Sequence, residues 1–114
     1  MTLKHGIAYD EHTLEKMRGS KYVQSNMCDI YKAVRNKIKE NEWVLFVGTP
    51  CQVAALNLFL KNIDTSRLIT VDILCHGVPS QKMLKRYIKE KSSGKNTIDI
   101  QWTGELEKWL REIL

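Results

Sequence analysis

Hydrophobic and polar positions along this chain form blocks that predict strands and helices in turn. Two apolar runs, at 43–47 and 67–74, are typical of strands buried on both faces. Weaker patterns, an alternation over 21–25 and a β-rich stretch over 97–102, predict two further strands. The helical patterns cover 11–17, 26–40, 50–61, the segment that follows Ser80 and ends before 92–95, and 105–114.

The alternation of strand and helix predicts one α/β domain over 1–114. We expect a mainly parallel sheet of about four strands with helices on both faces. Right-handed crossovers place every strand-to-helix loop at the carboxyl edge of such a sheet, where ligands bind. The segments 48–52 and 75–80 are two such loops, and each contains a cysteine. Cys51 and Cys75 are therefore predicted to face one crevice.

The loop at 48–52 has the sequence of a capped helix start. Gly48 frees the backbone to turn, Thr49 suits the N-cap, and Pro50 suits the first helical position. Gln52 stands where a capping box takes Glu or Gln. Cys51 then falls at the second helical position, among unpaired N–H groups at the positive end of the helix dipole. A thiol placed there loses its proton more readily than a free one, which suits metal ligation or redox chemistry.

Each of these residues also has a plainer interpretation. Cys51 and Cys75 could pack as small apolar residues, and Cys28, beside the core-facing Met27, is interpreted as structural. His76 could be a ligand, a proton donor or a hydrogen-bond partner of a cofactor, or a loop histidine bound to a carbonyl. A thiol enzyme with Cys51 as nucleophile and His76 as base is a further possibility.

Two polar residues near the predicted strands raise similar alternatives. Lys21 could hold a phosphate or a flavin, or be an ordinary surface lysine. Asp72 lies in an apolar strand and would need a partner if it were buried.

Composition narrows the classes of protein. The chain has 114 residues and a net charge of +5 that is spread along the sequence. Basic residues on two predicted helices, within 26–40 and after Ser80, either form solvated faces or attract an anionic partner. It lacks a basic patch interleaved with aromatic residues and zinc-finger spacing, which argues against nucleic-acid binding. No apolar run approaches the roughly 20 residues of a membrane span, and the N-terminus lacks the apolar part of a signal peptide. Three cysteines do not suggest a secreted disulfide framework, so we expect a cytoplasmic protein.

Three sequence blocks resemble one family when they are taken together. They are Gly19–Ser25 (GSKYVQS), Val44–Leu56 (VLFVGTPCQVAAL) and Asp72–Ser80 (DILCHGVPS). Over roughly residues 6–92 the chain resembles the coenzyme F-420 hydrogenase/dehydrogenase beta-subunit family, in its bacterial, polysaccharide-biosynthesis-associated type. Fuller members of that family are iron–sulfur flavoprotein oxidoreductases that pass electrons between a 4Fe-4S cluster, FAD and a substrate such as a deazaflavin.

The resemblance implies site residues but no particular catalytic residue. It implies that Cys51 and Cys75 are metal ligands. The cofactor-binding residues that we predict are Ser20, Lys21, Tyr22, Gly48, Thr49, Pro50, Gln52, His76 and Gly77.

The chain also departs from the family pattern. A 4Fe-4S cluster takes four thiolates, whereas this chain has three cysteines, and residues 93–114 diverge from the motifs. The resemblance therefore implies a shortened member or fragment, active only with a redox partner protein or a ferredoxin-like domain. The alternative is a non-catalytic α/β interaction module with structural cysteines, which docks through its basic helices or the Trp109–Leu110 face.

Overall fold

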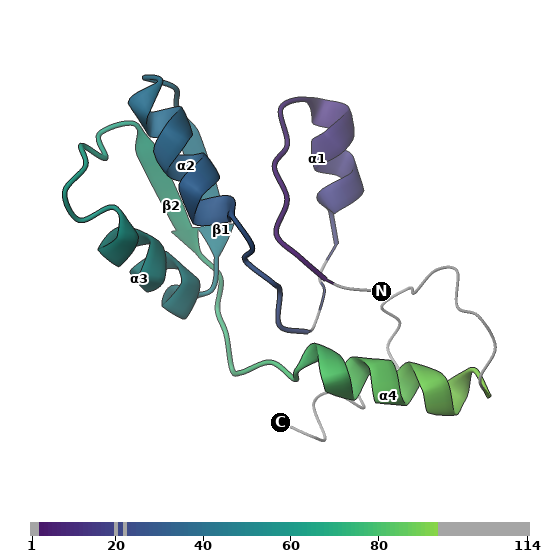
Figure 1. The fold of residues 1–114 in the computed structure, drawn as a ribbon. Coiled ribbons are helices and arrows are strands. Elements are labelled where there is room, and N and C mark those ends of the chain that lie inside the picture. The colour runs from purple at the N-terminus through teal and green to yellow at the C-terminus, as the bar shows by residue number, and fades with distance from the viewer. Residues whose placement is uncertain (1–2, 20, 22, 94–114) are drawn as a thin grey trace. The chain divides into compact units, whose positions relative to one another are not determined.

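The computed structural model describes residues 3–19, 21 and 23–93 (Figure 1). The chain divides into two compact units, one of residues 27–75 and one of residues 1–26 and 76–114. The predicted strand at 97–102 and helix at 105–114 lie outside the described residues. The assignment of the whole chain to one domain stays a prediction.

The unit of residues 27–75 is built on a strand–helix–strand motif. Its elements are α2 (Ile30–Lys39), β1 (Val44–Gly48), α3 (Pro50–Phe59) and β2 (Leu68–Asp72). Strands β1 and β2 pair in parallel, with Val44 opposite Leu68 and Gly48 opposite Asp72. A parallel pair joined by a helix confirms the α/β class.

The core of this unit lies on one face of the sheet. Phe46 of β1 is buried there, and Leu56 of α3 is inaccessible to solvent. Both α2 and α3 contribute to the same cluster, so both helices cover the face that Phe46 occupies. The members of the cluster are Val34, Ile38, Phe46, Val53, Leu56 and Leu60.

The predicted number of strands is wrong for the described residues, because the sheet has two strands rather than about four. Within the unit of residues 27–75, α2 and α3 both pack on the face that Phe46 occupies. The described residues of the predicted strand at 21–25, residues 21 and 23–25, are not in a strand. Its neighbour Asn26 makes an isolated bridge with Lys4, and Gln24 N–H donates to Pro79 O at 3.0 Å, so these backbone groups are satisfied outside a ladder.

Helix α2 starts four residues later than the sequence pattern predicts. Cys28 has a left-handed backbone with φ of 45°, and Asp29 occupies the N-cap position. A left-handed residue cannot continue an α-helix, so the apolar periodicity of Met27 belongs to a turn that precedes Ile30. Strand β2 likewise ends at Asp72, two residues before the predicted end.

The other unit contains α1 (Glu11–Met17) and α4 (Gln81–Lys91), both close to their predicted bounds. Asp10 caps α1 by accepting a hydrogen bond from Thr13 N–H at 2.6 Å. Ser80 caps α4 as predicted. No helix in the described part of the chain has the length and apolar character needed to cross a membrane.

Candidate functional site

Cys51 lies in the first turn of α3, as the sequence predicts. Pro50 is the first helical residue and Thr49 is the N-cap. The Thr49 N–H donates to Gln52 Oε1 at 2.9 Å, which is the hydrogen bond expected of Gln52 in a capping box. Cys51 is exposed, and its Sγ atom lies 3.1 Å from Thr49 Oγ1. The cap thus fixes the backbone from which the thiol projects.

Gly48 is required at the end of β1 by close packing. Its backbone does not have the positive φ that marks Gly19 and Gly77, so its predicted role as a freely turning residue is wrong. A Cβ atom at Gly48 would instead lie 2.9 Å from Phe46 Cε1 and 3.0 Å from Gln52 Oε1. The turn into α3 therefore fits closely between the core and the cap.

Cys75 leaves the sheet at the same edge as Cys51. The Ile73 N–H donates to the Gly48 carbonyl at 2.8 Å, so the chain beyond β2 stays paired with the end of β1. Cys75 follows two residues later and is exposed. Asp72 is also exposed at the end of β2, so it needs no buried partner. The prediction that both cysteine loops start from the carboxyl edge is confirmed.

All three cysteines are exposed, and none forms a disulfide. The interpretation of Cys51 and Cys75 as residues packed in the core is therefore wrong. Cys28 is not packed as a core residue either, because it lies in the turn before α2.

Tyr31 of α2 belongs to the surroundings of Cys51, although the sequence pattern assigned it no role beyond the apolar stripe. Its hydroxyl donates to the Gln52 carbonyl at 3.0 Å, which ties α2 to the first turn of α3. Burial raises the pKa of Tyr31, and the charge of ionised Cys51 nearby raises it further. The signal in the sequence was a hydroxyl-bearing residue on the apolar stripe of a helix, which needs a hydrogen-bond partner.

The residues present do not make a complete iron–sulfur site. No group of three or more potential metal ligands gathers anywhere in 3–19, 21 and 23–93, a range that includes every cysteine of the chain. A 4Fe-4S cluster held by four thiolates does not fit three cysteines so arranged. Cys51 and Cys75 could supply only part of such a ligand set.

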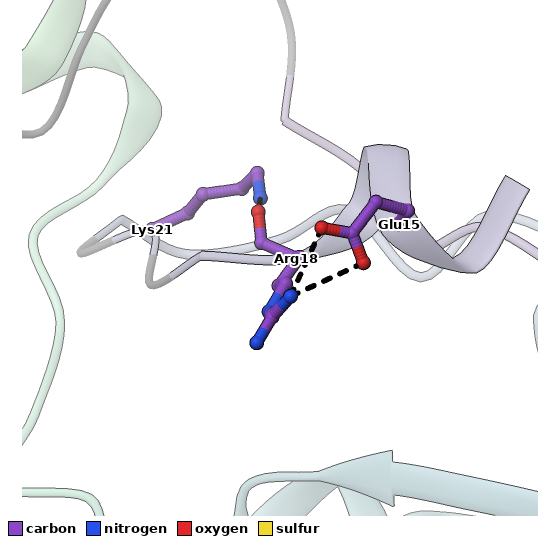
Figure 2. Close-up of polar contacts among 3 residues, drawn as sticks. All are labelled: Glu15, Arg18 and Lys21. Carbon is purple, nitrogen blue, oxygen red and sulfur yellow. Dashed lines mark hydrogen bonds and ion pairs between the residues drawn. The ribbon is translucent and has the colours of Figure 1, made fainter. Parts of the chain in front are cut away.

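The side chain of Lys21 is hydrogen-bonded to backbone carbonyls of its own unit. Its ammonium donates to the carbonyls of Met17 at 3.1 Å, Gly19 at 3.0 Å and Arg18 at 3.4 Å. Figure 2 shows Lys21 beside Arg18, whose guanidinium pairs with Glu15 at 3.0 Å. Lys21 thus satisfies carbonyls at the end of α1, where a cation is favoured.

The remaining predicted cofactor residues are placed as follows. Ser20 and Tyr22 lie outside the described residues. His76 is exposed, and Gly77 has φ of 102° in the loop before α4. Both belong to the unit that contains Lys21, whereas residues 48–52 and Cys75 belong to the other.

One comparison with known proteins gave a match. The family model for the C terminus of the coenzyme F420 hydrogenase/dehydrogenase beta subunit matches residues 41–112. The matched range contains both cysteine loops and begins after the Gly19–Ser25 block. It also includes most of residues 93–114, so the expectation that this segment diverges from the family is wrong over 93–112. The comparisons with curated proteins and with solved structures gave no match.

Proposed function

The chain belongs to the coenzyme F420 hydrogenase/dehydrogenase beta-subunit family, and we propose that it forms part of the redox core of such an oxidoreductase. In this proposal it helps to hold FAD and a 4Fe-4S cluster, between which electrons pass on their way to or from a deazaflavin-like or other substrate. We place the assembly in the cytoplasm.

One observation carries this proposal. Two exposed thiols, Cys51 and Cys75, leave the same edge of a parallel sheet, and the Ile73–Gly48 hydrogen bond joins the bases of their loops. Ligands of open α/β folds bind outside this edge. Thiols that only contributed to packing would be buried there.

Cys51 and Cys75 would each contribute a thiolate to the cluster. The missing ligands would come from a redox partner protein or a ferredoxin-like domain, since a cluster takes four thiolates. The Cys51 N–H lies in the first turn of α3, where no carbonyl of the helix can accept from it, and would be available to a flavin phosphate. Residues 48–52 would line the flavin, which supplies the electron-transfer chemistry when bound.

The proposal is tested by anaerobic incubation of the chain with FAD, ferrous iron and sulfide, followed by gel filtration. We expect weak flavin binding, and iron bound in an amount that falls in Cys51→Ser and in Cys75→Ser. Cys28→Ser is the matched control, because it removes an exposed thiol from the turn before α2 and not from either strand-to-helix loop, and it should retain the iron of the parent. Absence of flavin and iron from the parent, or equal loss of iron in all three variants, would contradict the proposal.

A second measurement tests the thiols without any cofactor. We expect iodoacetamide near neutral pH to label Cys51 and Cys75 in the native chain, because both thiols are exposed. Labelling of Cys51 or Cys75 only after denaturation, measured by peptide mass spectrometry, would instead argue for packed, structural cysteines.

A further inference from the structure

Helix α4 has a row of basic side chains on one face. The helix contains five basic residues and a single acidic one. Residues at i, i+3, i+4 and i+7 share a face of a helix, and four of the basic residues have this spacing. We call these four residues the basic stripe: Lys82, Lys85, Arg86 and Lys89. All four are exposed, and the stripe extends about 10 Å along α4.

The basic stripe is unfavourable for the helix that carries it. Like charges three or four residues apart on a helix repel each other. Lys82 lies in the first turn, near the positive end of the helix dipole, and that turn contains no acidic residue. In the described part of the chain, an ion pair relieves only Arg86, whose Nε atom lies 3.6 Å from Glu90 Oε1. The stability of α4 therefore does not explain why these charges gather on one face.

Helix α2 of the same chain treats its lysines differently. Lys32 pairs with Asp29 at 3.0 Å. Lys37 pairs with Glu40 at 3.3 Å and with Glu42 at 3.2 Å. Departures from such local preferences are typical of functional sites, so the basic stripe points to a role in binding.

The charge of the stripe selects an anionic partner. Three of its four residues are lysines, whose flexible and strongly hydrated ammonium groups suit a loose electrostatic contact better than a fixed bidentate one. The net charge of +5 adds attraction at longer range. Complementary charge of this kind speeds the encounter of two proteins and weakens as salt is added.

A membrane and a nucleic acid suit the stripe less well. The apolar side of α4 contains Leu84, which is buried in the protein, so α4 does not offer that side to a bilayer. The stripe has no aromatic residue on which a base could stack. Tyr87, the aromatic residue of α4, is half-buried, and the Lys91 ammonium lies 5.9 Å from the centre of its ring.

We propose that the basic stripe is the docking site for an acidic surface of a partner protein. The inference rests on the proposed function in one respect, since it takes this partner to be the electron-transfer protein of the redox assembly. Encounters between electron-transfer proteins bury little surface and are short-lived, which matches four cations spread over about 10 Å.

The test is binding of an acidic peptide to the full chain, followed by NMR without flavin or iron. The 14-residue peptide has glutamate at i, i+3, i+4 and i+7 and Ala and Gln elsewhere. At low ionic strength we expect amide shift changes on α4, and we expect binding to weaken about tenfold at about 0.15 M salt. Because no cofactor is present, failure here leaves the cofactor test unaffected.

The double variant Lys82→Gln/Lys85→Gln should weaken binding of the peptide at least fivefold. Lys32→Gln/Lys39→Gln is the matched control, because it removes the same charge from two exposed lysines of α2, and it should bind within about twofold of the parent. Equal weakening by the two double variants would trace binding to net charge alone and overturn the proposal.

Two further outcomes would assign the stripe to a different occupant and overturn the proposal as well. Both are measured at about 0.15 M salt. Tighter binding to phosphatidylserine-containing vesicles than to the peptide, lost in Lys82→Gln/Lys85→Gln, would assign it to a membrane. The same result with a DNA duplex would assign it to a nucleic acid.

Discussion

The Ile73 amide and the Gly48 carbonyl, 2.8 Å apart, hold the starts of the two cysteine loops together. This bond extends the pairing of β1 and β2 by one residue beyond the last residue of β2. Any displacement at Gly48 therefore acts on both loops at once.

Gly48→Ala should destabilise the fold and disturb the start of α3. The new Cβ would lie 2.9 Å from Phe46 Cε1, in a buried ring that has little room to move, and 3.0 Å from the Gln52 oxygen that caps Thr49. Overpacking of this kind costs about 1–3 kcal/mol. Urea unfolding measures the cost, and a value within about 0.5 kcal/mol of the parent would contradict the close fit.

The ionisation of Tyr31 should report on Cys51. Burial, the larger cause, and the charge of Cys51 both raise the pKa of Tyr31 above 10.0. In Cys51→Ser we expect this pKa to fall but to stay above 10.0, because burial remains. The pH titration of the Tyr31 ring carbons by NMR measures it, with Cys28→Ser as the control that should leave it unchanged.

The same shift has a consequence for stability. The folded state favours neutral Tyr31. The stability that Tyr31 contributes to the fold is therefore fully present below pH 10.0 and is lost as the pH rises through the raised pKa of the folded state. An unchanged or higher pKa of Tyr31 in Cys51→Ser would show that the thiol does not act on the hydroxyl.

Leu56→Ala should destabilise the unit of residues 27–75 far more than Leu58→Ala. Leu56 is wholly buried in the cluster between the helices and β1, whereas Leu58 on the same helix is 74% exposed. Loss of a buried leucine side chain costs about 2–5 kcal/mol, and loss of an exposed one about 0.5 kcal/mol or less. Similar unfolding midpoints for the two variants in urea would be inconsistent with this core.

Helix α1 should lose its N-cap in acid. Hydrogen bonds from Thr13 hold the pKa of Asp10 below 3.8. Because the folded state favours the carboxylate, the stability that Asp10 contributes is present above pH 3.8 and disappears as pH falls through the lowered pKa. The Cα chemical shifts of α1, followed from neutral pH into acid, measure this change.

Two variants separate the cap from its charge. Asp10→Asn should keep the cap with little dependence on pH, because an amide oxygen also accepts the Thr13 hydrogen bond. Asp10→Ala should weaken α1 at every pH. Acid loss of α1 that persists in Asp10→Asn would exclude Asp10 as its cause.

Local chemistry made much of this fold predictable. Thr49, Pro50 and Gln52 form the helix start that their side chains favour, and the apolar runs around Phe46 and Leu68 form the parallel pair. The strand predicted at 21–25 failed because five alternating residues do not establish where their backbone groups will bond. The predicted start of α2 was too early, because the spacing of apolar residues does not reveal a residue with a left-handed backbone such as Cys28.

The candidate site was predictable in its placement but less so in its surroundings. Topology alone brought Cys51 and Cys75 to one sheet edge. The hydroxyl of Tyr31 reaches Gln52 from a helix 21 residues earlier, a contact that depends on how α2 packs. The exposure of Leu45 and Ile69 was equally unpredictable, because the apolar strands indicated cover on both sides.

The position of Lys21 has a final consequence for any anion that approaches it. Its ammonium already serves three carbonyls at the end of α1. A flavin phosphate that bound this ammonium would leave the three carbonyls to water. Binding of the phosphate at Lys21 would therefore loosen the last turn of α1, and that loosening would report that the ligand has bound.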